Sequence, residues 1–358
     1  MPLTSLRFFA AAMIVVHHGT VDFALPPVPL TLDQGVSFFF VLSGFILTYR
    51  YPELAGWQAI RRFLILRVAR IWPAHAITTI AAIFVFGLAV DYRLIAHLLM
   101  IHAWIPSWPW YFGYNGVSWS ISTEFFFYLY FPILIVDWRN TYWRKLLLGV
   151  LFLAALMTTA QLLGLQPMTA ADEMTLHGLL YISPLARFLE FMGGMVACAL
   201  FLKTAPAFSA LPRWMFTLLE IAVVALACWA LAKHPLYGMG VTYLPPMAEH
   251  YLAHADVWPG VIPLIFVFAF QKGALSKLLS LRPFILLGET SYSLYLVHSM
   301  PFNVLAKQLG ITGAFGFAIG AVIALLLAFA LWQWVEKPGR AIGRRLAGPA
   351  SSFRTSSA

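Results

Sequence analysis

The sequence predicts an all-α polytopic membrane helical bundle with about ten transmembrane helices and both termini in the cytoplasm. Of its 358 residues, 61% are hydrophobic and 10% are charged, whereas a soluble domain carries roughly a quarter charged residues. The mean hydropathy is +0.81. The apolar residues fall in runs of about 20, the length at which a helix crosses a bilayer. One membrane domain can therefore use nearly the whole chain.

Ten apolar runs bounded by Pro, Gly or charged residues are predicted as spanning helices. They are Leu6–Val21, Gln34–Arg50, Pro73–Val90, Val117–Val136, Leu146–Gly164, Tyr181–Phe201, Trp214–Leu231, Val257–Phe270, Pro283–Leu305 and Gly313–Val335. The further apolar segment Leu94–Trp104 is expected to dip into the membrane without crossing it. We expect one transmembrane domain over residues 1–345 and a short disordered cytoplasmic tail over 346–358.

The positions of Lys and Arg predict the orientation of the bundle, because cytoplasmic loops are enriched in them. With the N-terminus inside, most basic residues fall in inner loops, and the segment from Arg61 to Arg70 is the densest group. The net charge of +9 is thus explained by topology. No continuous basic face exists, so a nucleic-acid partner is not predicted. Cys198 and Cys228 lie in separate apolar runs without CxxC spacing, and no metal site is predicted.

The first helix carries ionisable residues, which are costly in a bilayer and therefore mark functional candidates. Arg7 and His18 are eleven residues apart, a separation that returns to within about 20° of the same helix face. We expect the two side chains to face one groove. His17 points about 80° away from Arg7 by the same geometry and is expected to lie outside that groove. The alternative is a basic helix end plus an interfacial histidine pair.

Two later helices carry polar stripes. Ser120, Glu124 and Tyr128 recur every four residues on an aromatic segment, and Glu124 is predicted to pair with His18 at similar depth, fixing the tautomer of the imidazole. The alternative partners for Glu124 are the helix backbone or Arg187. In the ninth helix, Ser291, Tyr295 and His298 share a face. That stripe is interpreted either as lining the same cavity or as buried and internally satisfied.

Basic and aromatic groups mark the two ends of the bundle. Arg67 and Arg70, one helical turn apart, form a pair suited to binding phosphates. The alternative is ordinary positive-inside anchoring or contact with anionic lipid. The predicted outer loop is crowded with aromatic rings that are able to stack on a sugar or to form an interfacial belt. These residues are Trp104, Trp108, Trp110, Tyr111, Tyr114 and Trp119.

Five motifs occur in order along the chain. They are the Arg-x10-His spacing from Arg7 to His18, G-V-S-F-F-F-V-L-S-G-F from Gly35, R-x-x-R-I-x-P from Arg67, S-W-S-I-S-T-E-F-F-F-Y around Glu124, and L-G-E-T-S-Y-S-L-Y-L-V-H ending at His298. Together they resemble the acyltransferase-3 family of membrane O-acyltransferases, which modify bacterial cell-surface polysaccharides and lipids. The resemblance covers nearly the whole chain. It implies transfer of an acyl group, with acetyl the preferred one, to a hydroxyl of a cell-surface or exported glycan.

The same resemblance assigns roles to residues. His18 is implied as the catalytic residue, with Glu124 orienting it. Acetyl-coenzyme A is implied as a co-substrate that enters from the cytoplasm, without any tightly bound cofactor. Its predicted contacts are Arg7, Arg67 and Arg70, with Ser43, Ser120, Tyr128, Tyr295 and His298 as further substrate contacts. The other implied partners are a glycan or glycolipid acceptor and membrane lipids, with the protein in the bacterial inner membrane.

The chain departs from the family pattern at two positions. Many relatives carry an acidic residue where Ser37 stands, and His75 replaces a frequent Tyr. The polar interaction of that acidic residue is expected to be weaker at Ser37 or to come from another group such as Asp33. The hydrolase-like domain of some relatives is not expected, so acceptor delivery falls to the membrane domain or to a partner.

Several alternatives stay open at this point. His18 acts either as a general base on the acceptor hydroxyl or as a nucleophile that carries the acyl group itself. The acceptor is extracytoplasmic, or else a macrolide or lipid-linked sugar precursor. The rival class is a lipid or glycan transporter that uses the same charges as a pathway, although no inverted repeat is apparent.

Overall fold

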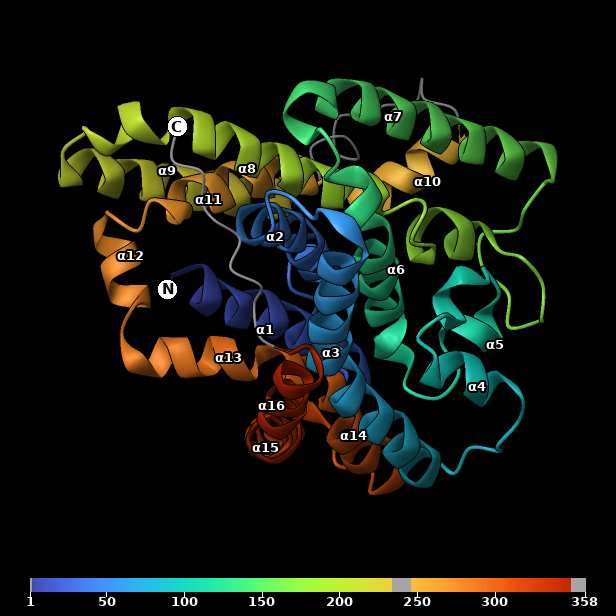
Figure 1. Ribbon diagram of the computed structural model, residues 1–358. Coiled ribbons are helices and arrows are strands. Elements are labelled where there is room, and N and C mark those ends of the chain that lie inside the picture. Colours follow the sequence, from blue (N-terminus) through green and yellow to red (C-terminus); the bar gives the residue numbers. More distant parts are fainter. Residues whose placement is uncertain (1, 234–245, 349–358) are drawn as a thin grey trace.

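The computed structural model describes residues 2–233 and 246–348, and nearly every element in them is helical (Figure 1). Within those ranges the extended pairing is limited to an isolated bridge between Ser107 and Met174. The first helix, α1, runs through the middle of the molecule, and α2, α3, α6 and α13 lie around it (Figure 1). The prediction of an all-α membrane bundle is confirmed.

The long helices are α1 (Pro2–Asp22), α2 (Gly35–Arg50), α3 (Gly56–Phe86), α6 (Trp119–Leu134), α7 (Trp138–Leu162), α8 (Phe188–Ser209), α9 (Arg213–Lys233), α11 (Trp258–Ala269), α13 (Arg282–Val297) and α15 (Gly313–Leu331). Shorter helices are α4 (Arg93–Leu98), α5 (Trp108–Tyr111), α10 (Pro246–Ala255), α12 (Ala274–Leu279), α14 (Ser299–Phe302) and α16 (Lys337–Leu346). Single turns are η1 (Leu32–Gln34), η2 (His102–Trp104) and η3 (Gly116–Ser118), and π-helical turns are η4 (Gly178–Ile182), η5 (Asn303–Gln308) and η6 (Trp332–Glu336).

Seven helical stretches of the described residues are long and apolar enough to cross a membrane, and the chain is an integral membrane protein. The three predicted spans that do not reach this standard are α1, α6 and α13. Helix α1 has the length, but Arg7, His17 and His18 lower its hydropathy. Helices α6 and α13 have 16 residues each. All three helices contribute to the walls of the cavities described below, together with α2 and α3.

Some predicted boundaries are wrong. Pro73, predicted to begin the third span, lies inside α3, which starts 17 residues earlier at Gly56 and is 31 residues long. The segment Leu94–Trp104 forms the short elements α4 and η2. The end of the predicted tail, residues 349–358, lies outside the described residues. Its first part is held in place, since Arg62 Nη1 on α3 donates to the carbonyl oxygen of Ala347 at 3.1 Å.

Glycines bring the central helices into close contact. A Cβ on Gly44 of α2 would lie 1.9 Å from the carbonyl oxygen of Phe191 on α8, and a Cβ on Gly194 of α8 would lie 1.9 Å from that of Val41. In the same way, Gly288 of α13 faces the carbonyl oxygen of Thr4 on α1, at 2.0 Å from an added Cβ. Small residues at such crossings let backbones approach in a membrane. The positions of α1, α2, α8 and α13 are fixed by these contacts.

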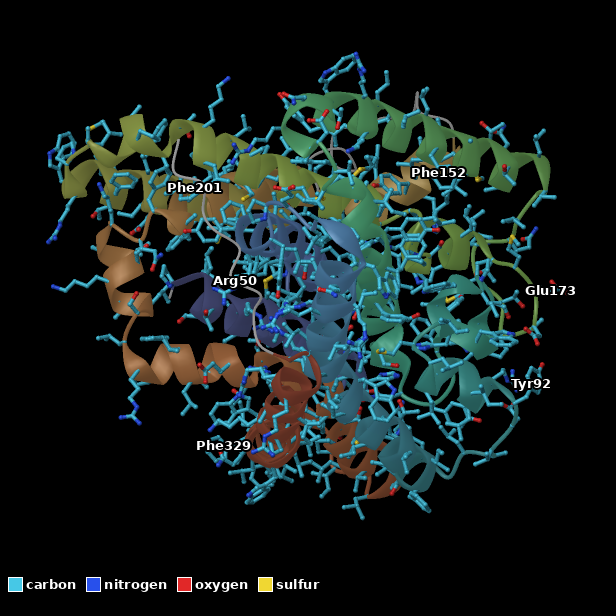
Figure 2. The ribbon with its side chains drawn as sticks, in the orientation of Figure 1. Arg50, Tyr92, Phe152, Glu173, Phe201 and Phe329 are labelled. Atoms are coloured by element: carbon cyan, nitrogen blue, oxygen red, sulfur yellow. The ribbon has the colours of Figure 1, made fainter. Side chains whose placement is uncertain are left out.

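The peripheral helices expose apolar side chains. Phe152 on α7 and Phe329 on α15 are both exposed and project from the surface of the bundle (Figure 2). In α7 only 11% of the apolar stretch is buried, compared with 72% for the stretch that contains α2. An apolar helix surface of this kind is stable only against lipid or another apolar surface. Helices α7, α9 and α15 therefore separate the central helices from lipid.

Candidate active site

Two cavities lie inside the bundle, and they differ in their ionisable side chains. The first, here called the arginine cavity, has a volume of about 310 Å³ and is lined by Arg7, Arg67, Arg70 and Arg340. The second, the histidine cavity, has a volume of about 620 Å³ and is lined by His17, His18, His177 and His254. Val36 and Tyr295 line both. The cavities therefore meet at these two side chains.

The arginine cavity collects cationic groups from three separate helices, α1, α3 and α16. Glu124 and Glu289 are the acidic side chains on its wall, so four guanidinium groups face two carboxylates. Arg67 Nε is buried without a hydrogen-bond partner, and its Nη2 lies 3.4 Å from the hydroxyl of Tyr51. Guanidinium groups bind phosphate oxygens with two parallel hydrogen bonds. The wall is therefore suited to an anionic ligand with several phosphates.

Arg340 is a member of this cavity that the sequence analysis did not identify. It lies on α16, and its Nη2 forms an ion pair of 2.5 Å with the buried carboxylate of Glu336. Since α16 packs on α3, the last helix brings Arg340 beside Arg67 and Arg70 on the cavity wall. A basic residue near a chain end looks like ordinary membrane anchoring in sequence, and its cavity position depends on tertiary packing.

Glu124 does not form the predicted pair with His18. Its Oε1 accepts hydrogen bonds from Ser43 Oγ at 2.8 Å and from the hydroxyl of Tyr128 at 2.5 Å. Ser120, Glu124 and Tyr128 do share one face, and all three line the arginine cavity. Ser120 is the member of this stripe that reaches the junction of the cavities, and Glu124 lies one helical turn, about 6 Å, further along α6. The depth estimated from the sequence placed Glu124 too close to His18.

His18 instead contacts His298. Its Nδ1 lies 2.7 Å from His298 Nε2, and the two rings are stacked with centroids 5.0 Å apart. His298 Nδ1 lies 2.7 Å from the carbonyl oxygen of Tyr295 and 3.2 Å from that of Leu294. A carbonyl oxygen only accepts, so His298 carries its proton on Nδ1 and, when neutral, accepts at Nε2. His18 must then donate from Nδ1.

This hydrogen-bond order leaves the lone pair of neutral His18 on Nε2. A fixed tautomer with a free ring nitrogen is the state that a general base or a nucleophile requires. His298 is fully buried, whereas His18 is partly exposed on the wall of the histidine cavity. Of the two imidazoles, His18 is thus the one that is accessible from the histidine cavity. His298 holds its orientation.

His17 also lines the histidine cavity, so the prediction that it lies outside the groove is wrong. The prediction of one groove shared by Arg7 and His18 is wrong as well, because the two residues line different cavities. The helix is long enough to pass from one cavity into the other. Eleven residues along α1 correspond to about 16 Å, which separates Arg7 in the arginine cavity from His18 in the histidine cavity.

Tyr295 makes the junction between the cavities. Its hydroxyl accepts a hydrogen bond from Ser120 Oγ at 2.8 Å and donates one to the carbonyl oxygen of Val117 at 2.7 Å. The ring of Tyr295 lies 6.0 Å from that of His298, centroid to centroid. The predicted stripe on α13 is therefore divided, with Tyr295 at the junction, His298 behind His18, and Ser291 bonded to the carbonyl oxygen of Gly288 within its own helix.

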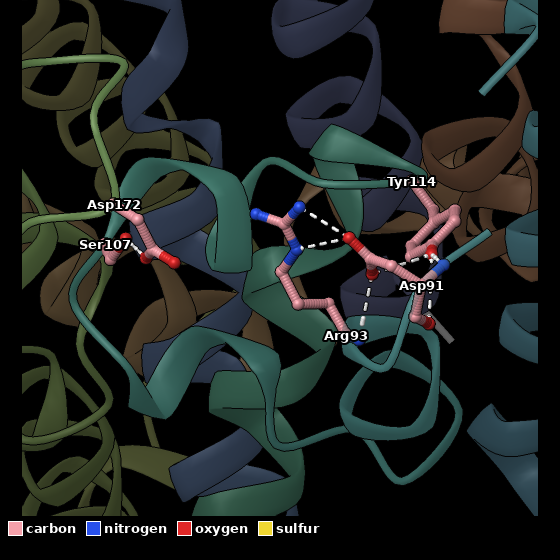
Figure 3. A network of polar contacts seen from close by, with 5 residues as sticks. All are labelled: Asp91, Arg93, Ser107, Tyr114 and Asp172. Carbon is pink, nitrogen blue, oxygen red and sulfur yellow. Dashed lines mark hydrogen bonds and ion pairs between the residues drawn. The ribbon is translucent and has the colours of Figure 1, made fainter. Parts of the chain in front are cut away.

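Part of the predicted aromatic loop lines the histidine cavity. Trp108, Tyr114 and Trp119 are on its wall, whereas Tyr111 is fully buried. Loop positions are fixed by polar contacts at the rim (Figure 3). Arg93 Nε donates to Asp91 Oδ2 at 2.7 Å, Tyr114 donates to Asp91 Oδ1 at 3.1 Å, and Ser107 donates to Asp172 at 2.6 Å. The hydrogen bond from Arg93 lowers the pKa of the Asp91 carboxyl and keeps it ionised.

A family model described as an acyltransferase domain matches residues 3–333. The chain belongs to the acyltransferase-3 family. It is accordingly an integral membrane O-acyltransferase, and the transporter alternative is set aside. No solved structure is detectably similar to it.

Named relatives are similar over nearly the whole chain. Acyltransferase MdmB of Streptomyces mycarofaciens is 29% identical over 96% of this chain and 92% of its own length. Exopolysaccharide production protein ExoZ of Rhizobium meliloti is 27% identical over 92% and 93%. O-acetyltransferase OatA of Staphylococcus aureus is 21% identical over 95% of this chain but 57% of its own length. Two of these names, MdmB and OatA, state acyl transfer, and the third states exopolysaccharide production.

The acyltransferase-3 resemblance raised the question of what replaces the acid at Ser37. The structure places a buried ion pair there. Arg187 Nη2 donates to Ser37 Oγ at 3.0 Å, and Arg187 Nη1 lies 3.0 Å from Glu190 Oε1, with both side chains fully buried. The group beside Ser37 is thus the Arg187–Glu190 ion pair, whereas Asp33, the example named from the sequence, lies on the wall of the histidine cavity. The guanidinium also lies over the rings of Tyr181 and Phe40, at 5.0 and 5.4 Å, so Arg187 supports the wall formed by Tyr181.

Proposed function

We propose that this acyltransferase-3 protein transfers an acetyl group from acetyl-coenzyme A to a hydroxyl of a cell-surface or exported glycan. The observation that carries the proposal is the junction of the arginine and histidine cavities at Val36 and Tyr295. Two cavities of different chemistry that meet beside an oriented imidazole suit a reaction between two substrates that enter separately.

The donor is assigned to the arginine cavity by charge. Coenzyme A carries several phosphate charges, and Arg7, Arg67, Arg70 and Arg340 offer planar donors for them. Ser43 and Tyr128, which hold Glu124, keep one carboxylate among these cations. The excess of positive charge remains available to the ligand. The same cavity extends to Tyr295, which also lines the histidine cavity, and the acyl end of a bound donor is expected to reach His18 past this residue.

The acceptor is assigned to the histidine cavity by shape and aromatic content. Its volume is the larger of the two, at about 620 Å³, and Trp108, Trp119 and Tyr181 supply flat apolar faces on which a sugar ring packs. The relative named for exopolysaccharide production, which aligns over nearly the full chain, supports a glycan. Acetyl is supported by the relative named as an O-acetyltransferase.

The chemistry follows from the tautomer of His18. Nε2 of His18 takes the proton of the acceptor hydroxyl as its oxygen attacks the thioester carbonyl carbon, forming the new C–O bond. The tetrahedral intermediate then collapses, the C–S bond breaks, and the coenzyme A thiolate leaves and takes the proton from His18. The cationic imidazole formed in between is held by its hydrogen bond to His298. In the variant with an acyl-histidine, Nε2 attacks the thioester carbonyl first, the C–S bond breaks and the coenzyme A thiolate leaves. The acceptor hydroxyl then attacks the acyl carbon, the C–N bond breaks to release neutral His18, and the hydroxyl proton passes to the thiolate.

The proposal also includes the orientation of the protein in the membrane. Because the Arg67 and Arg70 segment follows the basic group at Arg61 and Arg62, the arginine cavity is assigned to the cytoplasmic side and both termini to the cytoplasm. The histidine cavity then faces the outside of a bacterial inner membrane. Acetyl-coenzyme A is a cytoplasmic metabolite, whereas an exported glycan is outside, and this orientation supplies each substrate to its own cavity.

The experiment measures transfer of labelled acetyl from acetyl-coenzyme A to polysaccharide in membranes that contain native protein or His18→Ala at matched expression. The proposal expects transfer by native protein and its loss in His18→Ala. Acid quench under single-turnover conditions separates the two chemical routes, since only the covalent one leaves label on the protein. Absence of transfer by the correctly inserted native protein, over a range of glycan acceptors, contradicts the proposed substrates.

A further inference from the structure

Three histidines converge at a second position on the wall of the histidine cavity, apart from the His18–His298 pair. One ring nitrogen from each of His177, His250 and His254 lies within 4.8 Å of the others. His177 immediately precedes η4, and His250 and His254 are four residues apart on one face of α10. Of the three, His177 and His254 line the cavity itself.

We propose that His177, His250 and His254 bind a divalent transition-metal ion of the zinc class. Neutral imidazole is the common nitrogen ligand of Zn²⁺, with Zn–N distances of about 2.0 Å, so ligand nitrogens of a tetrahedral site lie about 3.3 Å apart. Ring movements of about 1 Å bring the three nitrogens of this cluster to that spacing.

The chemical state of the cluster supports metal binding. His250 Nε2 is buried and has no hydrogen-bond partner, a costly arrangement that a metal–nitrogen bond would remove. The cation beside the cluster, Arg187, donates to the backbone carbonyl oxygen of His254 and is neutralised by Glu190.

A metal ion bound by these three histidines would give the histidine cavity a fixed polar position on its wall. Three protein nitrogens leave one position of a tetrahedral ion for an oxygen ligand. Because His177 and His254 face the cavity, that ligand is water or a hydroxyl of the molecule bound there. The ion also joins α10 to the segment before η4. The site goes beyond the proposed acetyl transfer, and its occupancy is measurable without any transfer assay.

The test uses full-length protein purified in detergent, stripped with a chelator, incubated with Zn²⁺ or Co²⁺ and freed of unbound metal. Native protein is expected to retain about one ion per chain, with the strong visible absorption of tetrahedral Co²⁺. His250→Ala and His254→Ala are expected to lose it. The matched control is His17→Ala, which removes an imidazole from the same cavity outside the cluster and is expected to retain the ion.

Folding is controlled by a second measurement. Metal that binds only the folded state raises the Tm, so Zn²⁺ is expected to raise the Tm of native protein and of His17→Ala but not of His250→Ala. If His250→Ala does not fold, His250→Gln takes its place. Retention of less than a tenth of an equivalent by native protein, or equal retention in the cluster variants, overturns the proposal.

Discussion

The arginine cavity and the histidine cavity share two wall residues and differ in their principal basic groups. Both walls carry two carboxylates and aromatic rings, but the arginine cavity holds four guanidinium groups, whereas the histidine cavity holds four imidazoles. Guanidinium groups stay charged and bind anions, while imidazole exchanges protons near neutral pH. In the proposed function, the arginine cavity therefore binds the charged donor and the histidine cavity supplies the group that accepts the proton.

The largest expected effect lies in the histidine cavity. His18→Ala removes the free Nε2 and is expected to lower kcat about 10²- to 10⁴-fold, the range for loss of a general base. His17→Ala removes the neighbouring imidazole, which makes no hydrogen bond to His298 in the described contacts, and should lower kcat far less. Steady-state transfer assays on matched membranes measure both. Equal losses would mean that the two imidazoles act together.

The next largest effect is expected at His298, which orients the His18 imidazole. His298→Phe removes the acceptor for His18 Nδ1 and leaves that N–H unpaired, at a cost of about 1–3 kcal/mol, which corresponds to a loss in kcat of roughly 10- to 100-fold. His298→Gln keeps an oxygen acceptor and is expected to recover part of the rate. If His298 has only a structural role, the loss of kcat in each variant follows the decrease in its Tm. The loss then does not depend on whether the new side chain offers a hydrogen-bond acceptor.

The arginine cavity should respond in a different kinetic constant. Arg67→Gln and Arg70→Gln each remove charge-assisted hydrogen bonds worth about 1.5–3 kcal/mol and are expected to raise KM for acetyl-coenzyme A about 10- to 100-fold. The KM for the acceptor should stay within about twofold. Arg61→Gln is the matched control, because Arg61 lies on the same helix, is exposed and is not on the cavity wall. An equal rise in both KM values would remove the division between cavities.

The smallest effect is expected at the junction. Tyr295→Phe keeps the ring that separates the cavities and removes a hydroxyl that joins Ser120 to the carbonyl oxygen of Val117. One such neutral hydrogen bond contributes about 1 kcal/mol, so a loss of roughly fivefold in kcat is expected, with little change in either KM. A loss as large as that of His18→Ala would place this hydroxyl among the reacting groups.

Much of the fold was predictable from hydropathy, because in lipid an apolar run of sufficient length has few alternatives to a helix. The exceptions are instructive. Helices α1, α6 and α13 are polar or short because they form the cavities, and Pro73 was mistaken for a helix start although it lies within α3. A proline in a membrane helix is tolerated when neighbouring helices satisfy the backbone.

The sequence predicted many of the residues that form the site, but not which of these residues contact one another. Arg7, Arg67 and Arg70 do line one cavity, as the basic spacing and the family resemblance indicated. The hydrogen bond between His18 and His298 joins residues 280 positions apart, a contact that no local pattern encodes, and Glu124 was assigned to His18 only from estimated depth. Arg187 and Glu190 had a visible signal, opposite charges at i and i+3 in an apolar segment.

In the proposed mechanism, the donor and the acceptor reach His18 from opposite cavities. Sealed membrane vesicles of defined orientation test it, with labelled acetyl-coenzyme A placed only inside or only outside and a membrane-impermeant glycan acceptor on the other side. Transfer is expected when the donor is on the cytoplasmic face and the acceptor is on the opposite face, and no transfer is expected with His18→Ala. Transfer that requires both substrates on the same face would contradict it.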